Sequence, residues 1–281
     1  MEFLAQYHPA WLFGLALALL ATGIIAGVMA GLLGVGGGIV IVPVLYHLFT
    51  LLDIDPAVRM HLAVGTSLAT IIPTSIVSAR SHHRRGAMDI ELLRTLAPAV
   101  LAGAVIGGLF GSLLEGAVLS AIFALVALAV AANMAMRSEG TTLAATLPTR
   151  GLQRLLGAGI GSVSAVMGIG GGTLGVPILS AFNYPIRRAV GTASALGVII
   201  GVPGALGFLI AGLGLPDRPP GSIGYINLVG FALIVPLTMK TAPLGAKLAH
   251  RINPRWLRLA FAGFLALTAA RMFFDLLGSS S

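Results

Sequence analysis

Long apolar stretches joined by short polar links run through almost the whole chain. Because about 20 apolar residues in a helix cross a bilayer, this pattern predicts an all-α polytopic membrane protein with roughly eight to ten helical segments. The shortest segments are either halves of re-entrant hairpins or tilted arms of two full spans. The predicted segments are residues 11–33, 39–52, 62–79, 92–114, 117–136, 152–167, 173–182, 189–213, 223–246 and 256–277.

Two of the breaks between segments carry the same pattern of glycine and proline. The run Gly34-Val35-Gly36-Gly37-Gly38 is followed five residues later by Pro43. The run Gly168-Ile169-Gly170-Gly171-Gly172 is followed at the same spacing by Pro177. Two similar motifs in one apolar chain predict an internal repeat.

A second pair of motifs supports the repeat. Ala63-Val64-Gly65-Thr66-Ser67 matches Ala189-Val190-Gly191-Thr192-Ala193-Ser194, and both follow their glycine runs. Each half is therefore predicted to hold a broken helix pair and three full spans. We place the first membrane repeat at residues 1–136, a cytoplasmic connector at 137–151, the second repeat at 152–277 and a tail resembling a cloning remnant at 278–281.

The basic residues predict how these repeats are oriented. With the loop of Arg80, Arg84 and Arg85 in the cytoplasm, thirteen of the 17 Lys and Arg residues fall on that side. Loops after matching spans have opposite charge bias, so the positive-inside tendency makes the repeats inverted. Both termini are then predicted on the periplasmic side of a bacterial inner membrane.

Composition excludes several classes of function. With 57% hydrophobic and 9% charged residues and a mean hydropathy of +0.99, the chain is too apolar for a soluble domain. The net charge of +8 lies in short clusters between spans, so no nucleic-acid partner is expected. The chain has no cysteine, which excludes disulfides and thiolate sites, and we expect neither cofactor nor metal.

The glycine runs form the candidate binding site. Gly34, Pro43, Gly168 and Pro177 are predicted helix breaks. Consecutive glycines expose backbone N–H groups at the start of the next helix, where the helix dipole favours an anion. The alternative is that they only allow helices to pack closely. The predicted substrate-binding residues are Gly36, Gly37, Gly38, Gly170, Gly171 and Gly172, together with Thr66, Ser67, Thr192 and Ser194.

A lysine and several histidines are further candidates. Lys240 lies within the ninth segment and is predicted to bind the anion, with snorkelling of its long stem to the cytoplasmic surface as the alternative. His47 either relays protons or makes a packing hydrogen bond. His82 and His83 adjoin arginines, which favours solvated loop residues over a metal site.

The duplicated motifs resemble those of the sulfite exporter TauE/SafE family, with its 4-toluene sulfonate uptake permease-like anion transporters. The resemblance covers residues 22–274, almost the whole chain. It implies a multi-span inner-membrane protein that moves small anions, notably sulfite, sulfoacetate and other organosulfur compounds.

We therefore predict a secondary transporter that exports a small anion by alternating access, with its site between the repeats. Without a P-loop, an ion gradient or the membrane potential would supply the energy, and a coupled proton or ion is a possible partner. The other expected partners are the substrate and the lipid bilayer. The sequence leaves open whether the protein forms a homo-oligomer. The alternatives are an anion channel and a membrane-embedded enzyme. Paired mid-span aspartates, HExxH and Gly-x-Ser-x-Gly are absent, so no enzymatic activity is expected.

Overall fold

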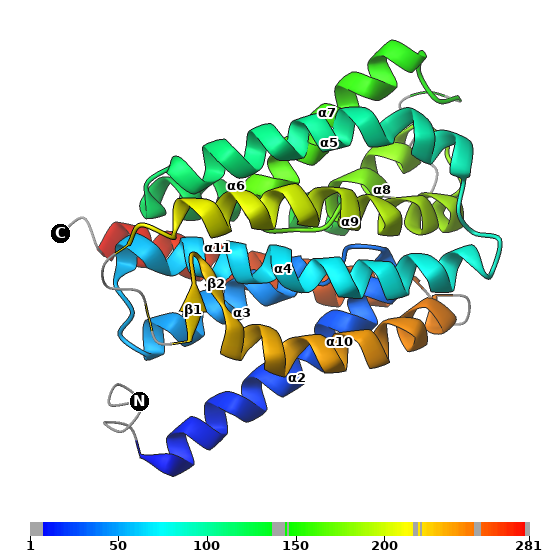
Figure 1. Ribbon diagram of the computed structural model, residues 1–281. Helices are drawn as coiled ribbons and strands as arrows, with labels where there is room; N and C mark the ends of the chain where they lie inside the picture. The colour runs from blue at the N-terminus through cyan, green and yellow to red at the C-terminus, as the bar shows by residue number, and fades with distance from the viewer. Residues whose placement is uncertain are drawn as a thin grey trace.

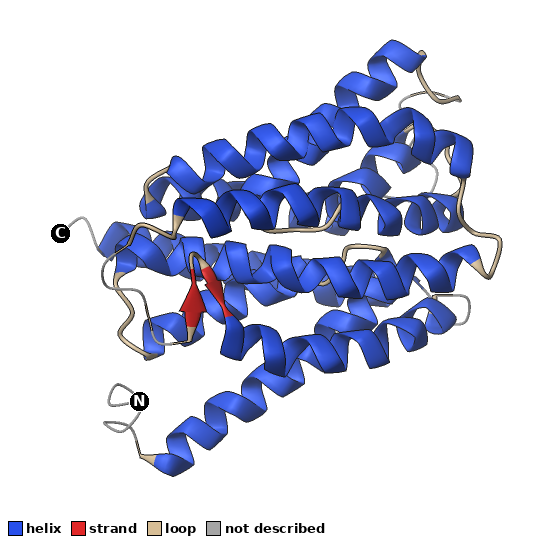
Figure 2. Ribbon diagram, viewed as in Figure 1, coloured by secondary structure: helices blue, strands red, loops and turns tan. Residues whose placement is uncertain are grey.

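The structure, a computed structural model, is a bundle of helices with one two-stranded hairpin (Figures 1 and 2). It describes residues 8–136, 144, 146–215, 219, 221–249 and 254–278. The elements are α2 (Pro9–Leu33), α3 (Gly38–Leu51), α4 (Pro56–His83), α5 (Ile90–Leu113), α6 (Gly116–Met136), α7 (Arg150–Met167), α8 (Gly172–Ala181), α9 (Ile186–Ala211), β1 (Ser222–Ile223), β2 (Ile226–Asn227), α10 (Leu228–Leu248) and α11 (Pro254–Gly278).

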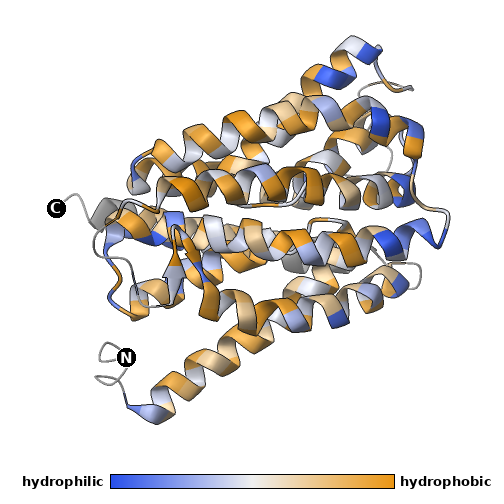
Figure 3. Cartoon of the chain, in the orientation of Figure 1, coloured by the Kyte–Doolittle hydropathy of each residue, from blue (hydrophilic) through white to orange (hydrophobic). Residues whose placement is uncertain are grey.

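The predicted all-α membrane fold is confirmed. Among the described residues, six helices are long and apolar enough to cross a membrane, and α3 and α8 are shorter apolar helices. Hydrophilic residues gather towards the two ends of the bundle, while the middle parts of the helices are mostly hydrophobic (Figure 3). Large side chains such as Phe13, Phe110 and Leu155 are exposed, as expected where lipid is the solvent.

The third helices of the two halves cross antiparallel at the centre of the bundle. Along α4, Leu68, Ser75 and Ser78 meet Gly204, Gly197 and Ser194 of α9, in reverse order. The halves, α2–α6 and α7–α11, therefore run in opposite directions, as the charge pattern predicts. In Figure 1 α4 runs from left to right and α9 from right to left.

The first helix of each half packs in parallel on the fourth helix of the other half. In α2, Gly23 lies against Ile234 of α10, and Gly31 lies against Ala242. The pairing of α7 with α5 repeats this geometry, and α11 packs on α6. Small residues let these backbones approach closely, which is the usual basis of helix association in membranes.

The two broken helix pairs enter the bundle from opposite ends. The pair α2–α3 starts and finishes at the left in Figure 1, and α7–α8 starts and finishes at the right. We call the right-hand end, where α4 ends and α9 begins, the basic end. It carries the exposed side chains of Arg84, Arg85, Arg187, Arg188 and Lys247.

The starts of two helices differ most from the sequence prediction. Helix α4 begins at Pro56 rather than at residue 62, because the Asp55 carboxylate accepts a 2.8 Å hydrogen bond from the Ala57 N–H. Helix α10 begins at Leu228 rather than at residue 223, because residues 222–227 pair as the β1–β2 hairpin. Asn227 then caps α10 by accepting from the Gly230 N–H at 2.8 Å.

Candidate functional site

The helix breaks lie at the glycine runs and not at the prolines. Gly34 ends α2 with a φ of 68°, and Gly168 ends α7 with a φ of 71°. This left-handed conformation suits glycine. Pro43 and Pro177 lie inside α3 and α8, so neither ends a helix and the prediction that they do is wrong.

The two glycine loops, residues 34–37 and 168–171, touch backbone to backbone. A Cβ atom on Gly170 would lie 3.1 Å from the Gly36 Cα atom. One on Gly172 would overlap the Gly34 carbonyl oxygen, and one on Gly38 would overlap that of Gly168. These glycines therefore allow the two halves to approach closely. This is the packing role that the sequence analysis gives as the alternative to a binding site.

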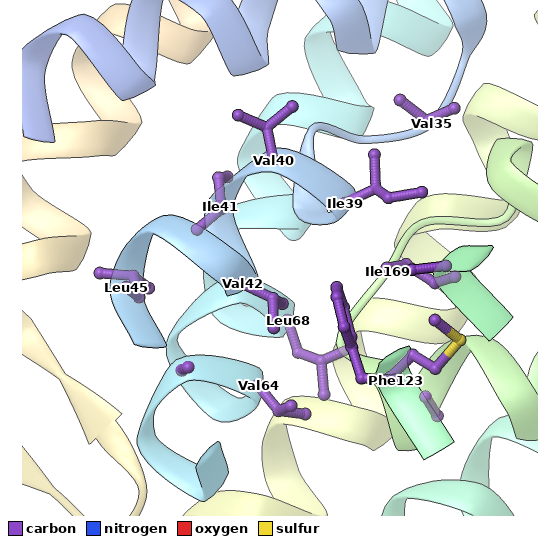
Figure 4. Close-up of a cluster of buried hydrophobic side chains, with 14 of the residues drawn as sticks. Val35, Ile39, Val40, Ile41, Val42, Leu45, Val64, Leu68, Phe123 and Ile169 are labelled. Atoms are coloured by element: carbon purple, nitrogen blue, oxygen red, sulfur yellow. The ribbon is translucent and has the colours of Figure 1, made fainter. Parts of the chain in front are cut away.

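Apolar side chains surround this contact. Val35 and Ile169, the second residues of the two runs, are both buried, and Figure 4 shows them in one cluster with Ile39 and Val42. Ile71 of α4 also meets the first loop. In this conformation the two loops are in contact, so a ligand requires either a shift of the loops or a position beside one of them.

The Ala-Val-Gly-Thr motifs hold the start of the fourth helix of the other half. The Thr66 Oγ1 accepts a 2.8 Å hydrogen bond from the Asn227 N–H at the start of α10. The Thr192 Oγ1 accepts a 3.0 Å bond from the Asp89 N–H at the start of α5. The structure thus places both threonines at helix caps rather than at the glycine loops.

Two predicted serines do lie at the glycine loops. The Ser67 Oγ donates a 2.7 Å hydrogen bond to the Gly168 carbonyl of the other half. The Ser194 Oγ lies 3.0 Å from the position of a Cβ atom on Gly34, again across the halves. Ser67 and Ser194 are therefore brought together with the glycine runs.

The structure places Lys240 elsewhere. Its side chain is exposed on α10, so it is not among the buried residues that meet the glycine loops. His47 is half-buried on α3, and no described residue forms a hydrogen bond with its Nδ1. His82 is buried with its Nε2 2.8 Å from the Gly31 carbonyl oxygen, so it is not the solvated loop residue predicted. Within the described residues, no group of three or more His, Cys, Asp and Glu side chains could hold a metal.

A face of buried hydroxyls on α4 was missed by the sequence analysis. Thr70, Thr74, Ser75 and Ser78 are all at most 1% exposed. The Thr74 Oγ1 lies 2.7 Å from the Thr238 Oγ1 of α10, which joins the two halves. Ser and Thr recur every three or four residues in this apolar span, and this spacing predicts a polar face on one side of the helix.

Different contacts join the halves at the two ends of α4. Away from the basic end, the ring of His61 stacks on Tyr225 with centroids 4.7 Å apart, and Phe208 adjoins both. At the basic end, the Tyr184 hydroxyl donates a 2.5 Å hydrogen bond to the Asp89 carboxylate. The bond from the Leu92 N–H and the bond from Tyr184 hold the pKa of Asp89 below its usual value.

The Asp89 contact predicts a pH dependence of stability. A carboxyl whose pKa is lowered in the folded state stabilises the protein above its unfolded pKa, and this is lost as pH falls through the folded pKa. Tyr184→Phe should raise that pKa, lower stability at neutral pH by about 1 kcal/mol and flatten the decline of Tm between about pH 5 and about pH 2. Thermal unfolding of both proteins across that range checks this; parallel curves would contradict it.

Comparison with known proteins gives a consistent result. The profile of the family described as sulfite exporter TauE/SafE matches residues 19–272. A "Probable membrane transporter protein" of Haemophilus influenzae is 36% identical over 265 residues, covering 93% of this chain and 99% of that protein. Another, of Methanocaldococcus jannaschii, is 27% identical over 251 residues, covering 89% of this chain and 92% of that protein. No solved structure matches the chain.

Proposed function

The chain belongs to the sulfite exporter TauE/SafE family, and on this premise we propose that it is a secondary transporter of a small anion. The cargo is sulfite or an organosulfur anion such as sulfoacetate. Its relatives are named as membrane transporter proteins, which supports the transport class. The cargo and the outward direction are our own assignments.

The meeting of the two glycine loops carries this proposal. Each loop closes a hairpin that enters from a different end of the bundle (Figure 1). A broken helix at membrane depth is tolerated where protein or a cavity covers its backbone, and transporter sites commonly form at such breaks between inverted halves. The residues before α3 and α8 are Gly37 and Gly171, which have no side chain to cap these helices. The N–H groups at both helix starts therefore suit an anion.

The charge distribution supports the orientation and direction. The basic end carries most of the described arginines, so we place it in the cytoplasm and both chain ends in the periplasm. The membrane potential then favours anion exit by about 2.3 kcal/mol per charge per 100 mV. Alternating access follows if α4 and α9, which cross at the centre, separate at one end at a time.

Counterflow in proteoliposomes tests this function. Vesicles holding the purified protein and unlabelled sulfite should accumulate external labelled sulfite transiently and saturably, whereas protein-free vesicles should not. Sulfoacetate on either side should compete. Ohmic single-channel currents without counterflow would instead identify an anion channel, and failure of every sulfur anion to move would reject the proposal.

A further inference from the structure

Ser75 on α4 is an unpaired hydroxyl beside the first glycine loop. Its side chain is fully buried, and its Oγ has no hydrogen-bond partner among the residues that the structure describes. The Oγ lies 3.1 Å from the position that a Cβ atom on Gly36 would occupy. A buried hydroxyl without a partner destabilises the folded state, so its presence at this loop requires a reason.

Two more hydroxyls lie near the same loop, Ser194 against it and Ser78 beside Ser194. The Ser78 Oγ donates to the Ala30 carbonyl at 3.2 Å and lies 3.3 Å from the Ser194 Oγ. Ser194 in turn lies against Gly34, the residue that ends α2. Both serines are at most 1% exposed. Hydroxyls from α4 and α9 therefore converge on the first loop from two sides, and each can rotate to donate to a ligand.

The backbone of the first loop adds donors. Gly36 and Gly37 have φ values of 68° and 82°, and α3 starts directly after them without a side-chain cap. The first N–H groups of a helix have no partner within the helix, and the dipole of the 14-residue α3 favours negative charge there. The loop and the serines thus offer donors of two kinds to one ligand.

The second loop has different surroundings. Gly168 is its only residue with positive φ, and Gly171 lies against the apolar side chains of Leu196 and Ile200. Ser75 and Ser78 lie ten and thirteen residues after Gly65, and the positions equally far after Gly191 are Gly201 and Gly204. The repeat has kept its glycine loops, but only the first half carries these serines.

We propose that Ser75, with Ser78, Ser194 and the N–H groups at the start of α3, forms an oxyanion subsite on the α4 side of the first glycine loop. This rests on the proposed transport function and assigns the ligand to one loop instead of to both equally. Because the loops touch each other, the ligand lies beside the first loop. His82 continues the polar face of α4 from this subsite towards the basic end. An oxyanion such as sulfite has several acceptor oxygens that these donors can engage at once, whereas chloride is a single spherical acceptor.

Ser75→Ala and Ser164→Ala form a matched pair of variants for the test. Ser164 on α7 is also fully buried, and its Oγ has no partner within the described part of the chain, but it precedes the second loop. Neither substitution removes a hydrogen bond, so neither should lower the Tm of the ligand-free protein. Ser75→Ala should weaken sulfite affinity by on the order of tenfold, whereas Ser164→Ala should stay within about twofold. Affinity is measured by sulfite-dependent thermal stabilisation in detergent and by the KM of uptake, with chloride as the control anion.

Each outcome decides between the two proposals. Weaker sulfite affinity in Ser75→Ala alone supports the subsite. Equal sulfite affinity in the wild type and in Ser75→Ala overturns the subsite and leaves the transport function intact. An equal loss in both variants also overturns it, because the effect would then not be specific to the first loop. If neither sulfite nor sulfoacetate stabilises or crosses with the wild type, the transport function and the subsite are both rejected.

Discussion

Gly172→Ala should abolish transport and lower the free energy of unfolding by about 3 kcal/mol. A methyl group there would overlap the Gly34 carbonyl oxygen and lie 2.7 Å from the Val35 nitrogen, both backbone atoms of the first loop. Backbone atoms cannot rotate away from the added methyl group as a side chain can. The two loops must therefore move apart to make room for it. Uptake in proteoliposomes and thermal unfolding of the purified protein measure the two effects.

Gly175→Ala is the matched control, three residues further along α8. A Cβ atom there meets only the Ala193 Cβ at 3.7 Å, an ordinary contact. Alanine is the better helix former by about 1 kcal/mol, so this variant should be as stable as the wild type or more stable, with normal transport. If Gly172→Ala behaved like Gly175→Ala, the close contact of the loops would be refuted.

Thr66→Val should lower stability by about 2 kcal/mol while leaving the affinity for substrate unchanged. Valine keeps the shape of threonine but leaves the Asn227 N–H without its acceptor, and both residues are buried. Thr192→Val should cost about half as much, because its partner at Asp89 is only half-buried and water can replace the lost bond. Chemical or thermal unfolding and the KM of uptake separate the two quantities.

Thr50→Val serves as the control for these threonines. Among the described residues, the Thr50 hydroxyl donates to the Tyr46 carbonyl of the same helix α3 and to no other group, so its loss should change stability little. A raised KM in Thr66→Val or Thr192→Val without loss of stability would restore the role that the sequence analysis gave these hydroxyls, as substrate ligands.

Much of the fold is predictable from the sequence because the membrane imposes simple rules. Apolar length marks the helices, and the distribution of arginine and lysine predicts that the halves run in opposite directions. The left-handed Gly34 and Gly168 end α2 and α7 where the glycine runs predict the breaks. Short-range polar signals were harder to use: residues 222–227 are apolar enough to extend a span but pair as a hairpin.

The candidate site was predictable in position but not in detail. The motif order brings the glycine loops together, yet no residue pattern says whether two loops touch or leave a space. The prolines do not mark helix ends, because Pro43 and Pro177 are accommodated inside α3 and α8. Thr66 and Thr192 were assigned to the ligand because the distant backbone N–H groups that they bind are invisible before folding. Lys240 is predicted from its charge and its position within an apolar segment, but the face of a helix cannot be assigned without knowing its neighbours.

The crosswise pairing of first and fourth helices affects how the chain is assembled during synthesis. Helix α7 leaves the ribosome after its partner α5 and can dock at once. Helix α2 leaves before α3–α9, and its partner α10 follows only after all of these helices have been made. Until then, the glycine face of α2 at Gly23, Gly27 and Gly31 must rest against lipid or an insertion factor. Two contacts with the same geometry therefore form at opposite stages of biogenesis, and the bundle closes only when α10 inserts.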